Sequence, residues 1–229
     1  MKKQRTSILR QSIAHEAARL MYEEGVDQYF DAKRLAAKRL FGRGGKKQMR
    51  YRPQDLPSNG EIQAALRQIV QIIEGELSQQ RLFAMRVIAL ETMNALEPFK
   101  PRLIGSVSTG HVRRGSDIDL HVFTDNIEDI EAYLHYLGWR FETQQVTIHV
   151  AGEYRDYTHI YYERVFPIEL SVYPHDEIRV THRSSTDGKP IVRFKPQALE
   201  QIITEQHSHA WELYLGTGEI QELDQFEAE

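Results

Sequence analysis

Two aspartates, Asp117 and Asp119, are separated by a single apolar residue. Side chains along a β-strand alternate between its two faces, so Ile118, Leu120 and Val122 would face a core and both carboxylates would share the other face. Carboxylates about 7 Å apart on one strand repel each other unless a cation lies between them. A hard divalent cation such as Mg2+ takes carboxylate oxygens as ligands. The spacing therefore favours a metal site.

A Gly-Ser pair and a third acidic residue complete the pattern. Gly105 and Ser106 lie upstream of the aspartates, and a glycine lets the backbone come close to a ligand. Glu169 alternates with apolar residues in the run 166–173, which predicts a strand with its carboxylate pointing away from the core. An isolated Asp-x-Asp or Gly-Ser pair is more often a solvated strand or a turn. The interpretation therefore depends on the combination.

The combined pattern resembles the signature of the DNA polymerase β-like nucleotidyltransferase superfamily, over roughly residues 80–175. That signature is an apolar residue with Gly-Ser, a spacer, Asp-apolar-Asp-apolar, and a later carboxylate on a neighbouring strand. The resemblance implies a nucleotidyltransferase-like mixed β-sheet flanked by helices, in an α+β fold. It also implies an enzyme that moves an NMP from an NTP to an acceptor hydroxyl and releases pyrophosphate.

The resemblance also implies a role for each residue of the pattern. Asp117 and Asp119 would bridge two Mg2+ or Mn2+ ions, and Glu169 would bind the ion on the side of the nucleophile. Gly105 and Ser106 would cradle the β- and γ-phosphates of the NTP. We therefore expect a nucleotide-binding, ATP-binding type of site, although the sequence does not identify the base.

Other polar residues near the pattern are interpreted from their positions alone. Arg113, Arg114 and Ser116 lie just before the carboxylate strand, and we expect them to bind phosphate. His121 follows Asp119 on the same face, and we expect it to be a hydrogen-bonded residue beside the site rather than an extra ligand. Further along, alternating residues could face solvent or a cleft: Thr147, His149, His159, Tyr161 and Glu163.

Composition restricts the class of protein. A chain of 229 residues with 41% hydrophobic and 27% charged residues is ordinary for a soluble globular protein. No apolar run approaches the roughly 18–20 residues of a membrane span, and the N-terminus lacks the apolar region of a signal peptide. There is no cysteine, which excludes disulfides, thiol catalysis and thiolate metal sites. We therefore expect a cytoplasmic protein without a membrane partner.

The charges are unevenly distributed. Residues 1–52 hold 14 Lys and Arg against five Asp and Glu, a net charge of +9. The whole chain has a net charge of −4, so residues 53–229 have a net charge of −13. The segment from Lys33 to Arg52 contains nine basic residues and no acidic one. Such a segment suggests RNA or another polyanion as partner, or docking on the acidic part of the chain. A solvated surface is the plainer interpretation.

Helical periodicity predicts an α-helical N-terminal region over residues 1–97, basic in residues 1–52. Within it we expect helices at 8–24 and 29–41, and over 59–97 either one long helix or, in view of Gly75, a helix pair. Their apolar stripes could also serve a homodimer. Ser58 and Glu61 form a capping-box pattern at the start of this last segment.

Residues 98–229 are expected to form the catalytic domain. Its predicted elements are a strand at 102–106, the carboxylate strand at 117–123, a helix at 127–137, strands at 144–150, 157–165 and 167–173, and a helix at 196–215. Residues 42–47 are expected to form a flexible basic loop that is not a P-loop, either solvated or in contact with RNA or another polyanion. The polar loop at 183–190 could close over phosphates, but we expect a surface turn. The alternatives to an enzyme are a non-catalytic nucleotide- or RNA-binding protein that keeps the fold, and a structural interaction module. The complete set of carboxylates favours the enzyme, because a binder has no need of three.

Overall fold

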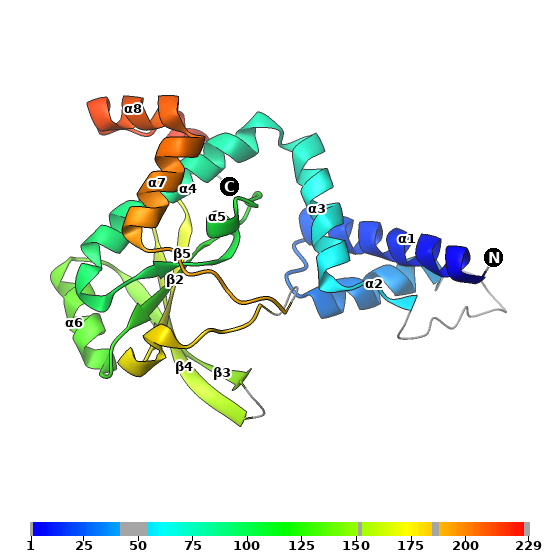
Figure 1. Cartoon of the computed structure of the whole chain (residues 1–229), viewed down its shortest axis with the longest axis horizontal. Helices are drawn as coiled ribbons and strands as arrows, with labels where there is room; N and C mark the ends of the chain where they lie inside the picture. Colours follow the sequence, from blue (N-terminus) through cyan, green and yellow to red (C-terminus); the bar gives the residue numbers. More distant parts are fainter. Residues whose placement is uncertain (1, 42–54, 151–152, 185–187, 227–229) are drawn as a thin grey trace. The chain divides into compact units, whose positions relative to one another are not determined.

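The computed structural model describes residues 2–41, 55–150, 153–184 and 188–226 (Figure 1). The chain forms two compact units. The smaller unit comprises Met1–Gly75 with Arg183–Pro190, and the larger comprises Glu76–His182 with Ile191–Glu229. Within the described residues, no helix combines the length and the apolar character that crossing a membrane would require.

Three helices form the described core of the smaller unit: α1 (Lys2–Glu23), α2 (Tyr29–Phe41) and α3 (Asn59–Ile73). The helices predicted at 8–24 and 29–41 are therefore confirmed, and α1 begins earlier than expected. Small residues line much of the interface and allow the helix axes to approach closely. The fully buried members of this core are Ile13, Ala17, Ala18, Leu20, Ala32, Ala36 and Ile62. The predicted basic loop at 42–47 lies outside the described residues.

The start of α3 carries the predicted capping box. The Ser58 hydroxyl accepts a hydrogen bond from the Glu61 amide, and the Glu61 carboxylate accepts one from the Ser58 amide. Arg10 on α1 donates to the same carboxylate at 2.6 Å. The helix ends before Gly75, whose φ of +51° is the left-handed conformation that glycine adopts easily. The segment 59–97 is thus a pair of helices rather than one.

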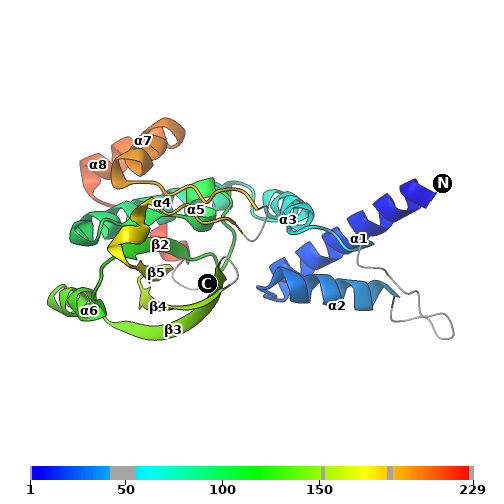
Figure 2. The same ribbon diagram turned by 60° about the horizontal axis from the view of Figure 1, so that its bottom comes forward.

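The second helix of that pair, α4 (Glu76–Ala95), is the central helix of the larger unit. Most of its residues from Leu82 to Met93 are buried on every side, as in a helix enclosed by other elements. It packs against α7 (Pro196–Gln206), and the two lie side by side in Figures 1 and 2. Residues 59–97 were assigned to the N-terminal region, with their second half expected to lead into the sheet, and the side chains of α4 share one apolar core with the sheet.

The larger unit contains a five-stranded mixed sheet in the order β1-β2-β5-β4-β3. β2 and β5 pair in parallel, and the other neighbouring pairs are antiparallel. The structure therefore confirms an α+β chain with a mixed sheet. The strands are β1 (Arg102–Leu103), β2 (Ile118–Phe123), β3 (Phe141–Val150), β4 (Glu153–Glu163) and β5 (Pro167–Tyr173).

One face of the sheet is packed against helices. Ile118, Leu120 and Val122 of β2 lie in the same buried core as residues of α4, α7 and α6 (Ile127–Tyr136). The alternate residues of β2 and β5 point to the opposite face, because side chains alternate along a strand. This opposite face carries the acidic residues.

β3 and β4 begin earlier than the strands predicted at 144–150 and 157–165, and two other predicted elements differ in type or continuity. The strand expected at 102–106 stops at Leu103, and Gly105–Thr109 forms the short helix α5 instead. The helix expected at 196–215 is two helices, α7 and α8 (Ser208–Thr217), with His207 at the break. The His207 ring packs against Phe83 and contacts Arg86 of α4, so a tertiary contact fixes the break.

Candidate metal centre

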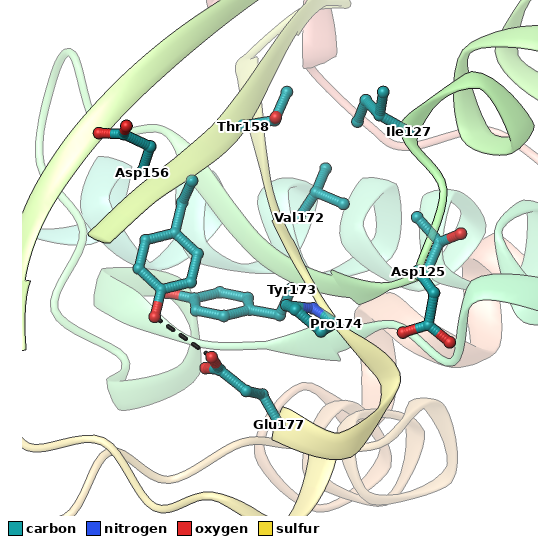
Figure 3. Close-up of a pocket in the computed structure, with 10 residues that line it drawn as sticks. Asp125, Ile127, Asp156, Thr158, Val172, Tyr173, Pro174 and Glu177 are labelled. Carbon is teal, nitrogen blue, oxygen red and sulfur yellow. Dashed lines mark hydrogen bonds between the residues drawn. The ribbon is translucent and has the colours of Figure 1, made fainter.

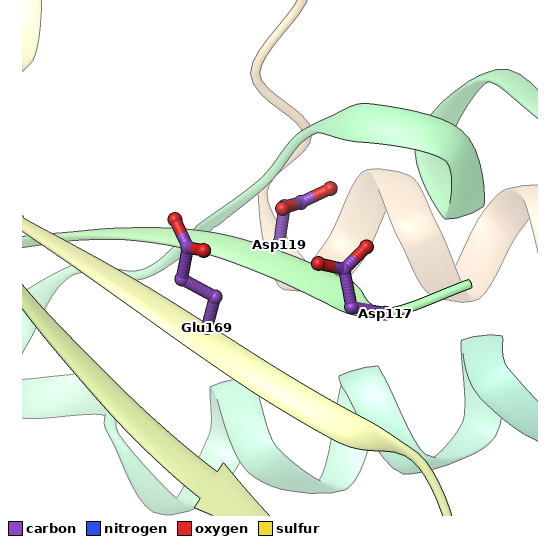
Figure 4. A group of neighbouring side chains, drawn as sticks. All are labelled: Asp117, Asp119 and Glu169. Atoms are coloured by element: carbon purple, nitrogen blue, oxygen red, sulfur yellow. The ribbon is translucent and has the colours of Figure 1, made fainter. Parts of the chain in front are cut away.

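Two neighbouring parallel strands bring the three predicted carboxylates together. Asp117 lies directly before β2, Asp119 lies within it, and Glu169 is the register partner of Asp119 on β5. Register partners on adjacent strands point to the same face. One potential ligand oxygen from each residue lies within 4.8 Å of the other two (Figure 4). The sheet thus holds the acidic side chains in a group that the sequence could only suggest.

The backbone at Gly105 lies directly against this group. Gly105 begins α5 with a φ of +70°, and a Cβ atom built there would lie 1.9 Å from Oδ2 of Asp119. No side chain fits in that space without moving the carboxylate. The amide of Ile104 also donates to the carbonyl of Asp119 at 3.0 Å, which ties the segment before α5 to β2. The Gly-Ser pair is therefore part of the same site as the aspartates.

The electrostatics of Asp119 are unfavourable for an isolated carboxylate. Burial, and then the neighbouring charges of Asp117 and Glu169, raise the pKa of Asp119 to about 8. An opposite charge close to such a group favours its ionised form. A divalent cation among the three carboxylates would supply that charge.

Glu169 has partners that favour its ionised form. Nδ1 of His159 on β4 lies 2.8 Å from Oε1 of Glu169, and this contact is the main cause of a lowered Glu169 pKa. The hydroxyl of Ser171 donates to the same oxygen at 3.4 Å. Burial, and then the charge of Glu169, raise the pKa of Tyr161. The surrounding strands therefore hold Glu169 as an oriented carboxylate.

The alternating residues expected at 147–163 have different surroundings. His159 is buried and Tyr161 is half-buried beside Glu169, whereas Glu163 is exposed. Thr147 is exposed and donates to Asp156 at 2.6 Å. The side chain of His149 lies outside the described residues. The period-two pattern identified the face of His159 and Tyr161, but it did not identify Glu169 as their partner.

Ser106 has a buried hydroxyl next to this group. Its Oγ has no hydrogen-bond partner among the residues that the structure describes. A buried hydroxyl without a partner costs free energy, so such a group is suited to meeting a ligand. A phosphate oxygen is one partner that this hydroxyl could bind.

Arg113, Arg114 and Ser116 belong to a tight turn before β2. The Ser116 hydroxyl accepts a hydrogen bond from the Arg113 amide at 3.0 Å, and the Ser116 amide donates to the Arg113 carbonyl at 3.0 Å. The Arg113 guanidinium donates to the Arg114 carbonyl at 3.1 Å. Ser116 thus shapes the turn. Phosphate binding by these three residues stays a prediction.

His121 lies on the same face, but its ring is hydrogen-bonded to another residue. Nε of Arg193 donates to Nδ1 of His121 at 3.0 Å. Burial, and then the charge of Arg193, lower the pKa of His121 to about 3, so the ring is neutral. Among the described residues, the group that could hold a metal comprises only Asp117, Asp119 and Glu169. The hydrogen-bonded role expected for His121 agrees with this geometry.

Arg193 is the residue of this region that the sequence analysis missed. Its guanidinium also donates to the carbonyls of Glu177 and Val180, at 3.1 and 3.0 Å, and lies over the rings of Phe123 and Tyr173. It comes from an irregular segment, so no periodicity marked it. Arg193 fixes the chain that covers the end of the sheet beyond His121.

The donor set fits a hard divalent cation. All three groups are carboxylates, and oxygen ligands of this kind suit Mg2+ or Mn2+. A thiolate ligand is excluded because the chain has no cysteine.

Neither the protein-family models nor the curated proteins with which the chain was compared gave a match. What the site does must therefore be inferred from its own geometry.

Proposed function

We propose that this protein is a metal-dependent nucleotidyltransferase that moves an NMP from an NTP to an acceptor hydroxyl. The observation that supports this proposal is the convergence of Asp117, Asp119 and Glu169 on the face of the sheet opposite the helices, directly against Gly105. In the reaction, the acceptor oxygen forms a bond to the α-phosphorus and the bond to pyrophosphate breaks. The acceptor hydroxyl loses its proton.

Asp117, Asp119 and Glu169 would hold Mg2+ or Mn2+, and the resemblance implies two such ions. Bound cations would neutralise charge on the triphosphate and activate the attacking hydroxyl. The protein's own contribution is to fix these ligands before the substrates bind. His159 does this for Glu169 through the contact of 2.8 Å. The close contact at Gly105 does it for Asp119.

Gly105 and Ser106 are suited to binding the β- and γ-phosphates. The backbone at Gly105 comes close to the metal ligands because it carries no side chain. The Ser106 hydroxyl has no hydrogen-bond partner among the described residues and can donate to a phosphate oxygen. Arg113 and Arg114 would add positive charge from the turn before β2.

RNA is the acceptor class that the basic segment Lys33–Arg52 favours. In the described part of that segment, Lys33 donates to Asn59, Arg39 pairs with Glu24, and Arg34 lies 3.6 Å from Asp31. The basic residues from Arg43 to Arg52 lie outside the described residues. Label transfer, described next, distinguishes RNA from protein and small metabolites as the acceptor.

Label transfer tests this proposal. The protein is incubated with each α-labelled NTP, Mg2+ or Mn2+, and separate fractions of cell RNA, protein and metabolites. The double variant Asp117→Asn/Asp119→Asn serves as the inactive control. We expect label in one fraction, dependent on the metal and lost in the control. Metal-dependent nucleotide binding without transfer would instead indicate a non-catalytic binder, and absence of both would contradict the proposal.

A further inference from the structure

Arg86 of α4 is a buried cation whose hydrogen-bond partners are all neutral. Only 2% of the residue is exposed. Its guanidinium donates to the carbonyl of Val107 at 3.3 Å and to Oε1 of Gln206 at 2.7 Å, and Nε2 of His207 lies 3.1 Å away. Burial, and then the charge of Arg86, lower the pKa of His207 to about 4, so this ring is neutral as well. No carboxylate of the described residues forms an ion pair with Arg86.

A positive charge in this position is costly. Burial lowers the pKa of Arg86, which means that the surroundings disfavour its charged form. Neutral acceptors orient a guanidinium, but they do not cancel its charge. An ionised group in the interior costs free energy unless an opposite charge lies close to it. An anion that binds near Arg86 would therefore be attracted by this charge and would offset it.

α5 connects this charge to the predicted phosphate site. α5 packs against α4, and Val107, which accepts a hydrogen bond from Arg86, directly follows Ser106. Val107 is two residues after Gly105, which is about 3 Å of rise along a helix. The buried Ser106 hydroxyl has no hydrogen-bond partner among the described residues. The side chain that we expect to bind phosphate therefore lies on the same short helix as the acceptor of Arg86.

Glycines at the two ends of α5 make room for groups of opposite charge. A Cβ atom at Gly105 would lie 1.9 Å from Oδ2 of Asp119, and one at Gly110 would lie 3.4 Å from Nη2 of Arg86. A helix as short as Gly105–Thr109 is not stable alone, so contacts with the rest of the fold decide where it lies. α5 is thus held between a predicted metal ligand at its start and a guanidinium just after its end.

The cavity at the carboxyl ends of β2 and β5 offers no such positive charge. Its volume is about 500 Å³, and Asp125 and Pro174, which follow the two strands, line it (Figure 3). Its ten lining residues also include Asp156 and Glu177, but no Lys or Arg. An acidic wall repels phosphate, so this cavity is not suited to the triphosphate of an NTP. The charge behind α5 is on the side where a triphosphate is expected.

We propose that Arg86 is a positioning residue of the phosphate site, which holds α5 through the Val107 carbonyl and supplies positive charge that a bound triphosphate offsets. This proposal rests on the proposed function, because that function places the β- and γ-phosphates at Gly105 and Ser106. Arg86 does not touch the NTP. It acts through α5 and through its charge, which salt screens little because the residue is buried.

Calorimetric titration of the full chain with each of the common NTPs in Mg2+ tests this proposal. Arg86→Met keeps an apolar stem and removes the charge, and we expect it to raise the Kd of the NTP roughly ten-fold, which corresponds to about 1.4 kcal/mol. Arg86→Lys keeps the charge and should stay within about three-fold of the natural chain. Arg86→Gln keeps a donor without the charge. It should bind as weakly as Arg86→Met, and it replaces that variant if Arg86→Met does not fold.

Two controls separate this role from lost stability and from diffuse attraction. Met93→Ala truncates a buried residue seven positions further along α4, about 10 Å away on the helix, and should lower the Tm without changing the Kd. Arg140→Met removes an exposed positive charge and should also leave the Kd unchanged.

Three results would overturn the proposal and leave the proposed function standing. They are natural affinity in both neutral variants of Arg86, a loss in Arg86→Lys as large as in Arg86→Met, and equal weakening in either control. Absence of NTP binding to the natural chain would instead contradict both this proposal and the proposed function.

Discussion

Nδ1 of His159 lies 2.8 Å from Oε1 of Glu169, so a residue of β4 orients a predicted metal ligand on β5. This relationship joins two strands that are antiparallel neighbours, with Tyr161 as the register partner of Glu169. The site therefore includes His159 in addition to its three carboxylates. Replacing a partner that orients a metal ligand typically costs about 10- to 100-fold in metal affinity or activity.

Replacing His159 should therefore weaken metal binding without removing a ligand. We expect His159→Phe to raise the Kd for Mn2+ roughly 10- to 100-fold, because the contact that most lowers the pKa of Glu169 is then lost. His159→Asn places an amide near the position of Nδ1 and should restore part of the affinity. Titration of both variants followed by Mn2+ electron paramagnetic resonance measures this. Equal Mn2+ affinity in His159→Phe and the natural chain would show that His159 does not contribute to metal binding.

A methyl group at Gly105 should disrupt the site. Gly105→Ala places a Cβ where Oδ2 of Asp119 now lies, so either the carboxylate or the backbone must move. A displacement of about 1 Å at a reacting centre can cost roughly a hundred-fold in rate, and we expect a loss of that size in nucleotidyl transfer.

The matched control for that change is Gly138→Ala. Gly138 also has a positive φ, of +73°, but a Cβ there meets nothing within 4 Å. Both variants carry the backbone strain of a non-glycine residue at positive φ, so both should lose thermal stability, and Gly105→Ala should lose more because of its contact with Asp119. Transfer activity should be retained in Gly138→Ala alone. Full activity in Gly105→Ala would show that Asp119 is not needed at its present position.

Removing one charge from the metal centre should stabilise the metal-free protein. In Asp119→Asn there is no longer a carboxyl, with a pKa raised from 3.8 to about 8, that must take up a proton or bear the repulsion of Asp117 and Glu169 when the chain folds. We expect the Tm without metal to rise by a few degrees at neutral pH, and the added stabilisation by Mg2+ to disappear. Calorimetric scans with EDTA and with Mg2+ measure both effects. A lower Tm without metal would show that Asp119 serves mainly to hold the fold.

The smaller unit should lose stability in acid through Glu61. Burial opposes ionisation of this carboxyl, but hydrogen bonds from Arg10 and Ser58 outweigh it and lower the pKa of Glu61 to about 2. A pKa lowered by folding adds stability above the unfolded value of 4.5, and this stability is lost as the pH falls from there towards 2.

Glu61→Gln tests that dependence. Its cost in stability should be greatest at neutral pH and should shrink as the pH falls below about 4.5. Urea unfolding followed by circular dichroism at several pH values measures it. Because the Glu61 side chain is 42% exposed, the effect should also weaken in high salt. Glu212→Gln, at an exposed position of α8, is the control. If the loss of stability in Glu61→Gln is independent of pH, it comes from the capping hydrogen bonds and not from the charge of Glu61.

The sequence predicted the elements that have a strong period or a clear stop. α2 has the predicted bounds, β5 matches its strand, and the break between α3 and α4 lies at Gly75, whose backbone conformation suits a break. The alternation around Asp117, Asp119 and Glu169 placed their side chains opposite the core. Strand pairing, which no local pattern encodes, then brought Glu169 beside Asp119.

Other features depend on contacts between distant segments. The helix after Gly105 follows from close packing on Asp119, and the break at His207 accompanies its contacts with α4. Arg193 reaches His121 from an irregular segment 72 residues away. The cavity beyond the carboxyl ends of β2 and β5 is lined from several separate segments, so no single motif could mark it.

Binding of a divalent cation by the three carboxylates is the property on which the proposed function depends most directly. Mn2+ titration followed by electron paramagnetic resonance, with and without ATP, measures that binding. We expect saturable binding that ATP strengthens, and a loss of roughly ten-fold or more in affinity in Asp119→Asn. Asp129→Asn, a change of one exposed charge elsewhere, should bind as the natural chain does. Undiminished Mn2+ binding in Asp119→Asn, or none in the natural chain, would contradict the account.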